Sequence, residues 1–165
     1  MSNINLRIGH GYDVHQLVDS IPLIICGVTI DFSKGSLGHS DGDVGIHGIC
    51  DAILGALALG DLGTHFPSSD SKWSGKDSSV FLMHVLKLMH NQDYDIQNID
   101  CTIILQSPHL NTYIKSMRKV ISAICKIDIG MVSIKATTTD YLGFIGKEQG
   151  IACLAVCLVN EGQST

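Results

Sequence analysis

The chain has 165 residues, 45% of them hydrophobic and only 16% charged, with a formal net charge of −5. That length suits a single domain, which we expect to occupy residues 1–165. The acidic balance and the lack of a lysine- and arginine-rich run argue against nucleic acid as the main partner, because neutralising phosphates requires clustered cations. No apolar stretch reaches the roughly 20 residues of a membrane span, and the first residues lack the apolar segment of a signal peptide. We therefore expect a cytoplasmic protein without a membrane partner.

The few charged residues predict an oligomer, because such a chain often buries additional surface against a partner. The cysteines lie among aliphatic residues and none forms a CxxC pair, which is typical of small buried hydrophobic residues in a reducing compartment. We expect free thiols at Cys26, Cys50, Cys101, Cys125, Cys153 and Cys157.

The first predicted element is a β-strand over residues 5–17, NLRIGHGYDVHQL. Successive side chains of a strand point to opposite faces. Asp13 and His15 therefore lie on one face of this strand, and His10 lies on the other.

The rest of the chain alternates between helical and strand-like patterns. Apolar residues three and four apart indicate helices, and short runs rich in β-branched residues indicate strands. In chain order we expect a hairpin at 21–32, a loop at 33–43, a helix at 43–59, a loop at 60–79, a helix at 78–91, a strand at 96–106, a helix at 110–127, strands at 131–139 and 151–159, and a polar tail at 160–165. This order predicts an α/β (α+β) fold, a mixed β-sheet with helices packed on one face.

Asp13 and His15 are candidate metal ligands. A divalent metal needs deprotonated donors that converge from a rigid backbone, and two donors at i and i+2 on one strand face meet that need. His47 is a suitable third donor, because it lies in the first turns of the predicted helix. Two histidines and a carboxylate would leave a fourth position open, as in catalytic zinc sites. By spacing alone, a hydrogen-bonded surface pair is the more common explanation.

Two further segments suit a phosphate group. In GHSDGDVGIH, Ser40 and the backbone amides of a helix N-terminus could receive a phosphate, although a capped helix after a polar loop explains the pattern equally well. In KATTTDYLGF, Thr137, Thr138 and Thr139 precede Asp140, and hydroxyls beside a carboxylate suit a site for phosphate and metal. Consecutive threonines also simply favour a strand.

Three long motifs carry a resemblance to a known family. They are RIGHGYDVHQL, GHSDGDVGIHGICDAILGALALGDLGTHFP and KATTTDYLGFIGKEQGIAC. Together they resemble the 2-C-methyl-D-erythritol 2,4-cyclodiphosphate synthases, over a core of about residues 7–159. The resemblance implies a homotrimer of α/β subunits, with active sites at the subunit interfaces.

The resemblance also implies a reaction, the metal-dependent cyclisation of 4-diphosphocytidyl-2-C-methyl-D-erythritol 2-phosphate in the non-mevalonate isoprenoid pathway. The 2-phosphate would attack the β-phosphorus, giving 2-C-methyl-D-erythritol 2,4-cyclodiphosphate and releasing CMP. Neither water nor a covalent enzyme intermediate would take part.

Metal ligands follow from the resemblance residue by residue. Zinc would bind Asp13, His15 and His47, with a substrate phosphate oxygen in the fourth position. A second metal, Mg²⁺ or Mn²⁺, would bind at Asp140, where the family usually has glutamate. The shorter aspartate side chain reduces the reach of the carboxylate by roughly 1.5 Å.

The resemblance assigns the other site residues as well. His39 and Thr138 would support the transition state. The residues binding the substrate would be Asp13, His15, His39, Ser40, Asp61, Gly63, Phe66, Ser68, Asp70, Ser78, Ala136, Thr137, Thr138, Thr139, Phe144 and Lys147. The neighbouring subunit would supply a cytidine pocket from Leu105, Ser107, His109, Leu110 and Asn111.

Two other functions are compatible with these residues. A zinc-dependent phosphohydrolase would hold water in the open zinc position. A trimeric regulator would bind a nucleotide or an isoprenoid diphosphate without converting it. Detection of a cyclic product together with CMP separates the synthase from both.

Overall fold

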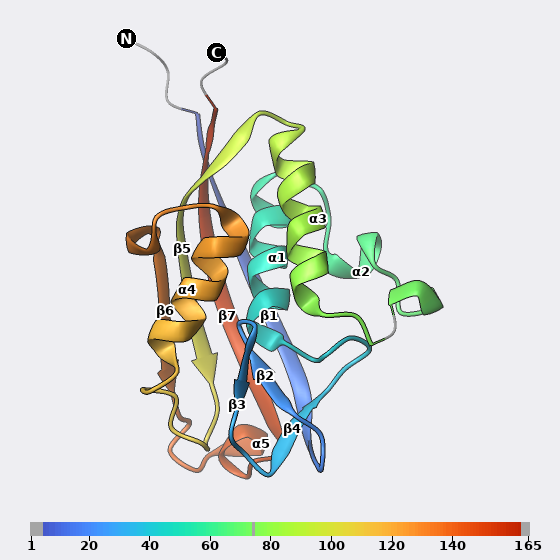
Figure 1. The fold of residues 1–165 in the computed structure, drawn as a ribbon, viewed down its shortest axis with the longest axis vertical. Helices are drawn as coiled ribbons and strands as arrows, with labels where there is room; N and C mark the ends of the chain where they lie inside the picture. Colours follow the sequence, from blue (N-terminus) through green and yellow to red (C-terminus); the bar gives the residue numbers. More distant parts are fainter. Residues whose placement is uncertain (1–4, 74, 163–165) are drawn as a thin grey trace.

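The structure is a computed structural model that describes residues 5–73 and 75–162. Within these residues it has a five-stranded sheet in the order β4-β1-β7-β5-β6 and a separate β2-β3 hairpin (Figure 1). The strands are β1 (Leu6–Asp19), β2 (Leu23–Ile25), β3 (Val28–Ile30), β4 (Lys34–Leu37), β5 (Tyr94–Ile104), β6 (Val132–Thr137) and β7 (Gly150–Glu161). The helices are α1 (Val44–Ala56), α2 (Leu62–His65), α3 (Ser78–His90), α4 (Ile114–Cys125) and α5 (Gly143–Gly146), with 3-10 turns η1 (Ser71–Trp73) and η2 (Ile129–Met131).

The sheet is mixed. β5 and β6 run parallel, whereas β1 pairs antiparallel with β4 and β7, and β5 pairs antiparallel with β7. A parallel pair needs a crossover, and α4 lies in the connection between β5 and β6. Helices α1, α3 and α4 all lie on the same face of the sheet (Figure 1). The predicted α/β (α+β) fold with helices on one face is confirmed.

Two glycines of β1 set the distance between the sheet and α1. Gly9 and Gly11 lie on the buried face of the strand. A Cβ at Gly9 would overlap the backbone carbonyl of Ala52, and a Cβ at Gly11 would overlap that of Gly48. Without side chains at these positions, α1 lies directly on β1, and its first turns come close to the polar half of the strand.

Some expected boundaries were wrong. The loop expected at 33–43 contains β4, which pairs with the end of β1 from Gln16↔Leu37 to Asp19↔Lys34. Its sequence KGSL has no alternating apolar pattern, so the strand depends on its partner. The loop expected at 60–79 contains α2 and η1. Of the expected polar tail, residues 160–161 extend β7, and residues 163–165 lie outside the described residues.

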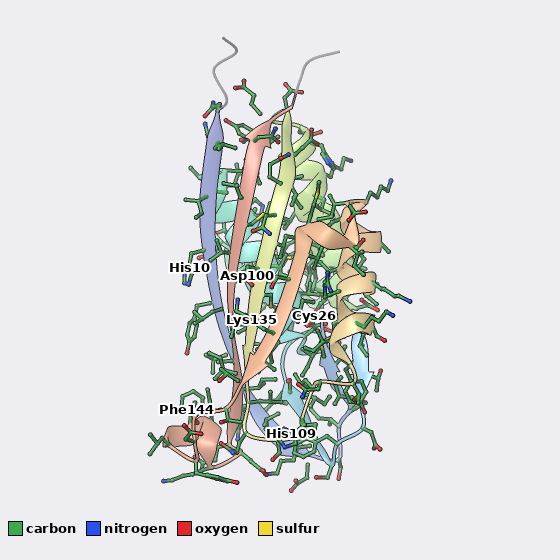
Figure 2. The ribbon with its side chains drawn as sticks, turned by 90° about the vertical axis from the view of Figure 1, so that its left-hand side faces the viewer. His10, Cys26, Asp100, His109, Lys135 and Phe144 are labelled. Atoms are coloured by element: carbon green, nitrogen blue, oxygen red, sulfur yellow. The ribbon has the colours of Figure 1, made fainter. Side chains whose placement is uncertain are left out.

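The face of the sheet opposite the helices is uncovered in the single chain. Ile8 and Tyr12 of β1 and Leu154 of β7 are exposed, Ile8 at 71%. His10 also points away from the helices, as predicted, and Asp100 and Lys135 form an ion pair on the neighbouring strands (Figure 2). An exposed apolar face of this kind suits burial against another subunit.

Two further expectations concern the core and the membrane. All six cysteines are free and buried, as the sequence predicted. Among the described residues, no helix has both the length and the apolar character needed to cross a bilayer.

Candidate metal centre and substrate site

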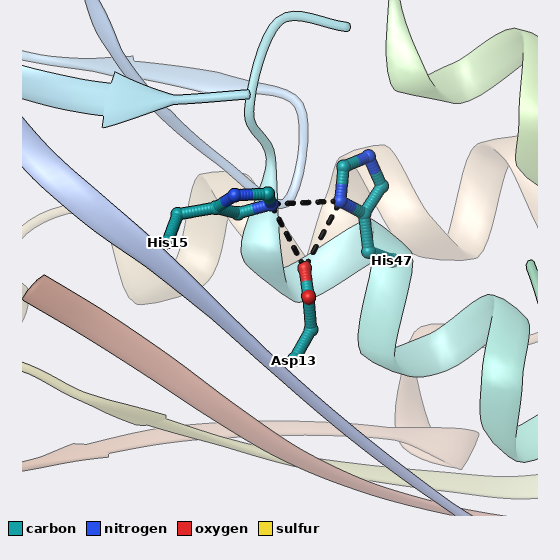
Figure 3. A group of neighbouring side chains, drawn as sticks. All are labelled: Asp13, His15 and His47. Carbon is teal, nitrogen blue, oxygen red and sulfur yellow. Dashed lines mark hydrogen bonds and ion pairs between the residues drawn. The ribbon is translucent and has the colours of Figure 1, made fainter. Parts of the chain in front are cut away.

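Three side chains converge where α1 begins and β1 becomes polar. Asp13 Oδ2 lies 3.0 Å from His15 Nε2 and 3.0 Å from His47 Nδ1. The two histidine nitrogens are also 3.0 Å apart, so the donor atoms form a nearly equilateral triangle (Figure 3). Strand alternation places Asp13 and His15 side by side, and α1 brings His47 to them from 32 residues further along the chain.

The triangle fits a zinc-sized ion. Donors 3.0 Å apart are close enough for all three to reach one ion at the roughly 2.0 Å ligand distance of zinc, and three protein ligands would leave a fourth position for another ligand. One carboxylate and two imidazoles are also the donor types that zinc prefers in catalytic sites. Among the described residues, this is the one group of three or more potential ligands that converges in this way.

The charges in the triangle favour a deprotonated aspartate. Burial would raise the pKa of Asp13, but hydrogen bonds from His15 and His47 outweigh it and hold this pKa well below its usual range. For His15, burial would lower the pKa, but the hydrogen bond and charge of Asp13 raise it above the ordinary value of 6.5. A metal therefore competes with a proton at His15 but not at Asp13.

Asp43 anchors the helix that carries His47. Its carboxylate caps α1 by accepting from Ile46 N at 3.0 Å, and it also accepts from Cys26 N at 2.8 Å and Gly27 N at 2.6 Å. Burial raises the pKa of Asp43 to about 6, although the three N–H donors oppose this. The cap joins the start of α1 to the β2-β3 turn. The sequence predicted a capped helix after a polar loop, and the structure places the cap at Asp43.

The second ring nitrogen of His47 faces two serines. His47 Nε2 is 3.0 Å from Ser40 Oγ and 3.0 Å from Ser78 Oγ. Ser78 is fully buried at the first position of α3. The resemblance implied that Ser78 binds substrate, but its hydroxyl contacts His47 Nε2, and Ser78 does not line the pocket beside the triangle.

A pocket of about 190 Å³ opens beside the triangle. Its predicted members are Asp13, His15, His39, Ser40, His47 and Phe66. Sequence reasoning missed Leu62, Trp73 and Phe81, which complete the wall. Phe66 packs edge-on against Trp73, with ring centroids 4.8 Å apart, and its ring centroid lies 4.7 Å from that of Phe81. The sequence signal for Trp73 and Phe81 was weak, because Trp73 lies in a polar segment and Phe81 has ordinary helical spacing.

Other predicted substrate residues lie on the exposed segment around α2 and η1. Asp61 caps α2 by accepting from Thr64 N at 2.8 Å. Gly63 and Ser68 are exposed, and Asp70 pairs with Lys72 at 2.6 Å. None of the four lines the pocket beside the triangle. Their roles remain predictions.

The residues expected to hold cytidine gather in a second, smaller pocket of about 60 Å³. The β5-α4 connection supplies one wall and the end of β6 the other, since Leu105 N donates to Thr137 O at 3.0 Å. Of the expected residues, only Ser107 is absent from the lining, whose members are Leu105, Gln106, Pro108, His109, Leu110, Asn111, Ala136, Thr137 and Thr138. This pocket shares no residue with the pocket beside the triangle.

Asp140 lies at an exposed turn after β6. Its backbone N–H donates to Thr138 Oγ1 at 3.2 Å, and its carboxylate is 3.4 Å from the same hydroxyl. Among the described residues it joins no cluster of three metal-ligating side chains. Phe144 and Lys147 follow on exposed positions of the next turn. A second metal at Asp140 would therefore need ligands from the substrate or from water.

The fold and the donor triangle define an α/β protein with a candidate metal site open to a pocket. The model of the YgbB family matches residues 6–160, so the chain belongs to this family. It is 52% identical to a 2-C-methyl-D-erythritol 2,4-cyclodiphosphate synthase of Pseudoalteromonas atlantica, covering 96% of this chain and 98% of the relative. It is 54% identical to the synthase of Clostridioides difficile, covering 93% and 96%.

Solved structures agree with these relatives. IspF of Plasmodium falciparum in a CDP complex is 36% identical, with a TM-score of 0.85 over 96% of this chain and 98% of that one. The bifunctional IspDF of Campylobacter jejuni is 35% identical, with a TM-score of 0.93 over 96% of this chain. This chain spans 43% of that bifunctional protein. The family resemblance seen in the sequence is confirmed.

Proposed function

We propose that the chain catalyses the cyclisation of 4-diphosphocytidyl-2-C-methyl-D-erythritol 2-phosphate to 2-C-methyl-D-erythritol 2,4-cyclodiphosphate, with release of CMP. The observation that carries this proposal is the triangle of Asp13, His15 and His47 opening into a pocket, in a chain of the YgbB family. The reaction makes the enzyme a phosphorus–oxygen lyase.

Zinc is the ion that Asp13, His15 and His47 would hold, and when bound it would polarise a phosphate oxygen of the substrate as a Lewis acid. Ser40 and His39 line the same pocket, and their side chains can donate to a phosphate placed there. The chain thus offers hydrogen-bond donors and a cation site to the phosphate that is attacked. The charge of this phosphate must be neutralised before the 2-phosphate can approach it.

The substrate itself favours cyclisation over hydrolysis. Phe66, Trp73 and Phe81 form an aromatic side of the pocket, whose other lining residues include Asp13, His15 and His47. The substrate carries its own nucleophile, so binding both phosphates in one molecule removes much of the entropic barrier. A phosphate is already nucleophilic and needs no general base from the protein.

Recognition of the leaving CMP is proposed for the smaller pocket formed by the β5-α4 connection and β6. Because this pocket shares no residue with the one beside the triangle, we propose that a neighbouring copy completes each site. The exposed apolar face of β1 and β7 provides the surface for such a homotrimer. Asp140 and the hydroxyl of Thr138 would hold Mg²⁺ or Mn²⁺ against the diphosphate.

A product assay tests the proposal. The purified protein with zinc and Mg²⁺ should convert the substrate to the cyclic diphosphate and an equal amount of CMP. Phosphorus NMR measures both products. His47→Ala should abolish zinc binding and turnover while the oligomer remains. His90→Ala, at the exposed end of α3, serves as the matched histidine control. A linear phosphate product would instead indicate the phosphohydrolase, and tight binding without turnover would indicate the regulator.

A further inference from the structure

The side chain of Gln106 joins the smaller pocket to residues 138–141, here called the Asp140 turn. Gln106 lies in the β5-α4 connection and lines the smaller pocket. Its Oε1 accepts from the backbone N–H of Tyr141 at 3.1 Å. Tyr141 directly follows Asp140, the residue expected to bind the second metal. One side chain therefore links the proposed cytidine pocket to the proposed second-metal site.

The backbone of the Asp140 turn is strained. Asp140 has a φ of 48° and Tyr141 has a φ of 64°. Both residues are therefore left-handed, a conformation that residues with a side chain rarely adopt. Strained backbone of this kind persists only where the surrounding structure holds it. The shape of the Asp140 turn thus depends on the contacts that fix it.

Gln106 is the distant partner among these contacts. Asp140 N donates to Thr138 Oγ1 at 3.2 Å, and Gly146 packs against the backbone of Tyr141. Both contacts come from the same short segment of the chain. The hydrogen bond to Gln106 spans 35 residues, whereas the others that the structure describes for this turn join residues no more than three positions apart. Gln106 therefore fixes the turn relative to the pocket.

The Asp140 turn lies at the rim of the smaller pocket. Thr138 lines this pocket, and its hydroxyl is 3.4 Å from the carboxylate of Asp140. Aspartate is one methylene shorter than the glutamate that the family resemblance leads us to expect at this position. The reach of the carboxylate therefore depends closely on where the backbone of Asp140 is held.

The amide of Gln106 is oriented by its partner. A backbone N–H can only donate, so the atom of Gln106 that faces Tyr141 is the carbonyl oxygen. A glutamate at this position could take over that contact, because a carboxylate also accepts hydrogen bonds. A leucine has no acceptor and would leave the N–H of Tyr141 without this partner. The two substitutions therefore separate the hydrogen bond from the space that the side chain fills.

We propose that Gln106 is a positioning residue, which holds the Asp140 turn in its left-handed conformation so that the carboxylate can bind a divalent cation on the diphosphate. Because Gln106 contacts both the pocket and the turn, it joins recognition of the nucleotide to binding of the second metal. The proposal rests on the proposed role of Asp140 as the ligand of that metal.

Binding of CDP with and without Mn²⁺ tests this role, because CDP carries both a cytidine and a diphosphate. Calorimetry on zinc-loaded wild type should show that Mn²⁺ strengthens CDP binding. In Gln106→Leu this gain should shrink by about 2–10-fold, the range expected for the loss of one hydrogen bond. Gln92→Leu, at an exposed glutamine after α3, is the matched control and should keep the full gain. An equal loss of CDP affinity with and without Mn²⁺ would show that Gln106 only shapes the pocket, and would overturn the proposal.

Two further variants complete the test. Gln106→Glu still accepts from the N–H of Tyr141, so it should keep the gain from Mn²⁺, and loss of the gain there would contradict the proposal. Gln106→Leu combined with Asp140→Ala should lose no more of the gain than Asp140→Ala alone, because Gln106 acts through Asp140. An additional loss in the double variant would show that Gln106 acts by another route and would also overturn the proposal.

Failure of the proposed function gives a different result. If Mn²⁺ did not strengthen CDP binding in wild type, Asp140 would not hold a second metal, and the role of Gln106 would be wrong together with it. If Mn²⁺ strengthened CDP binding equally in wild type and Gln106→Leu, but not in Asp140→Ala, the metal site would stand and only the role of Gln106 would be wrong.

Discussion

Gly11 of β1 lies directly beneath Gly48 of α1, so closely that a Cβ on Gly11 would overlap the carbonyl oxygen of Gly48. Gly48 also faces β7, where the sulfur of Cys153 would lie 2.9 Å from a Cβ at Gly48. The helix and the sheet therefore meet through backbone at this point. His47, the neighbour of Gly48, is held within reach of Asp13 and His15 by this contact.

Gly11→Ala should displace α1 and disrupt the metal triangle. Overpacking of this kind costs about 1–3 kcal/mol or more, because the obstructing atoms are backbone and cannot rotate away. We expect a lower denaturation midpoint and weaker zinc binding in the same variant. Gly55→Ala is the matched control on α1, where the added Cβ has normal space and should stabilise the helix by up to about 1 kcal/mol. Wild-type zinc affinity in Gly11→Ala would show that the close contact does not position His47.

Zinc affinity should fall as the pH decreases. In the metal-free protein Asp13 raises the pKa of His15 above 6.5, so below that raised value a proton occupies the nitrogen that zinc needs. The apparent affinity should reach its plateau above this pKa and weaken by up to about tenfold per pH unit below it. Asp13 adds nothing to this dependence, because it stays deprotonated throughout. A chelator competition from about pH 5 to pH 8 measures the curve, and a flat curve would exclude His15 as a ligand.

Asp140→Ala should weaken binding of the second metal, Mg²⁺ or Mn²⁺, and leave zinc binding unchanged. Loss of one charge-assisted contact, worth about 1.5–3 kcal/mol, should raise the Mg²⁺ or Mn²⁺ concentration for half-maximal turnover by at least about tenfold. Zinc content should stay at the wild-type level, because Asp140 is not part of the triangle. Asp140→Glu restores the longer side chain and should lower the half-maximal concentration. If titrations of Asp140→Ala and wild type coincided, Asp140 would not bind the metal.

Ile8→Asp should dissociate the proposed homotrimer. Ile8 is 71% exposed in the single chain and lies on the apolar face of β1 and β7. Burying an unpaired carboxylate in an interface costs several kcal/mol, and symmetry repeats that cost in each subunit. Sedimentation should show monomers, with turnover lost because each site lacks its neighbour. Met83→Asp replaces another exposed apolar residue, on α3, and should leave the oligomer intact. An Ile8→Asp protein that sediments as wild type would place the interface elsewhere.

Local patterns were enough for the elements that carry the ligands. The period of two in β1 put Asp13 and His15 on one face and His10 on the other, because strand side chains alternate wherever the strand pairs. Apolar residues at helical spacing after a polar loop placed α1 and its histidine. The family motifs, which are long and contiguous, identified the kind of enzyme. These properties depend only on residues close together in sequence.

Tertiary structure decided what depends on distant partners. β4 has no strand pattern of its own and exists because it pairs with β1. The smaller pocket forms because parallel pairing of β5 and β6 brings Leu105 beside Thr137. The contacts of Ser78 with Asp41 and His47 join residues up to 37 positions apart, and no spacing rule predicts them. Sequence alone thus determined which groups could bind a metal. The packing of α1 on two glycines of β1 decided that these groups meet, because only the folded backbone sets the distance between the strand and the helix.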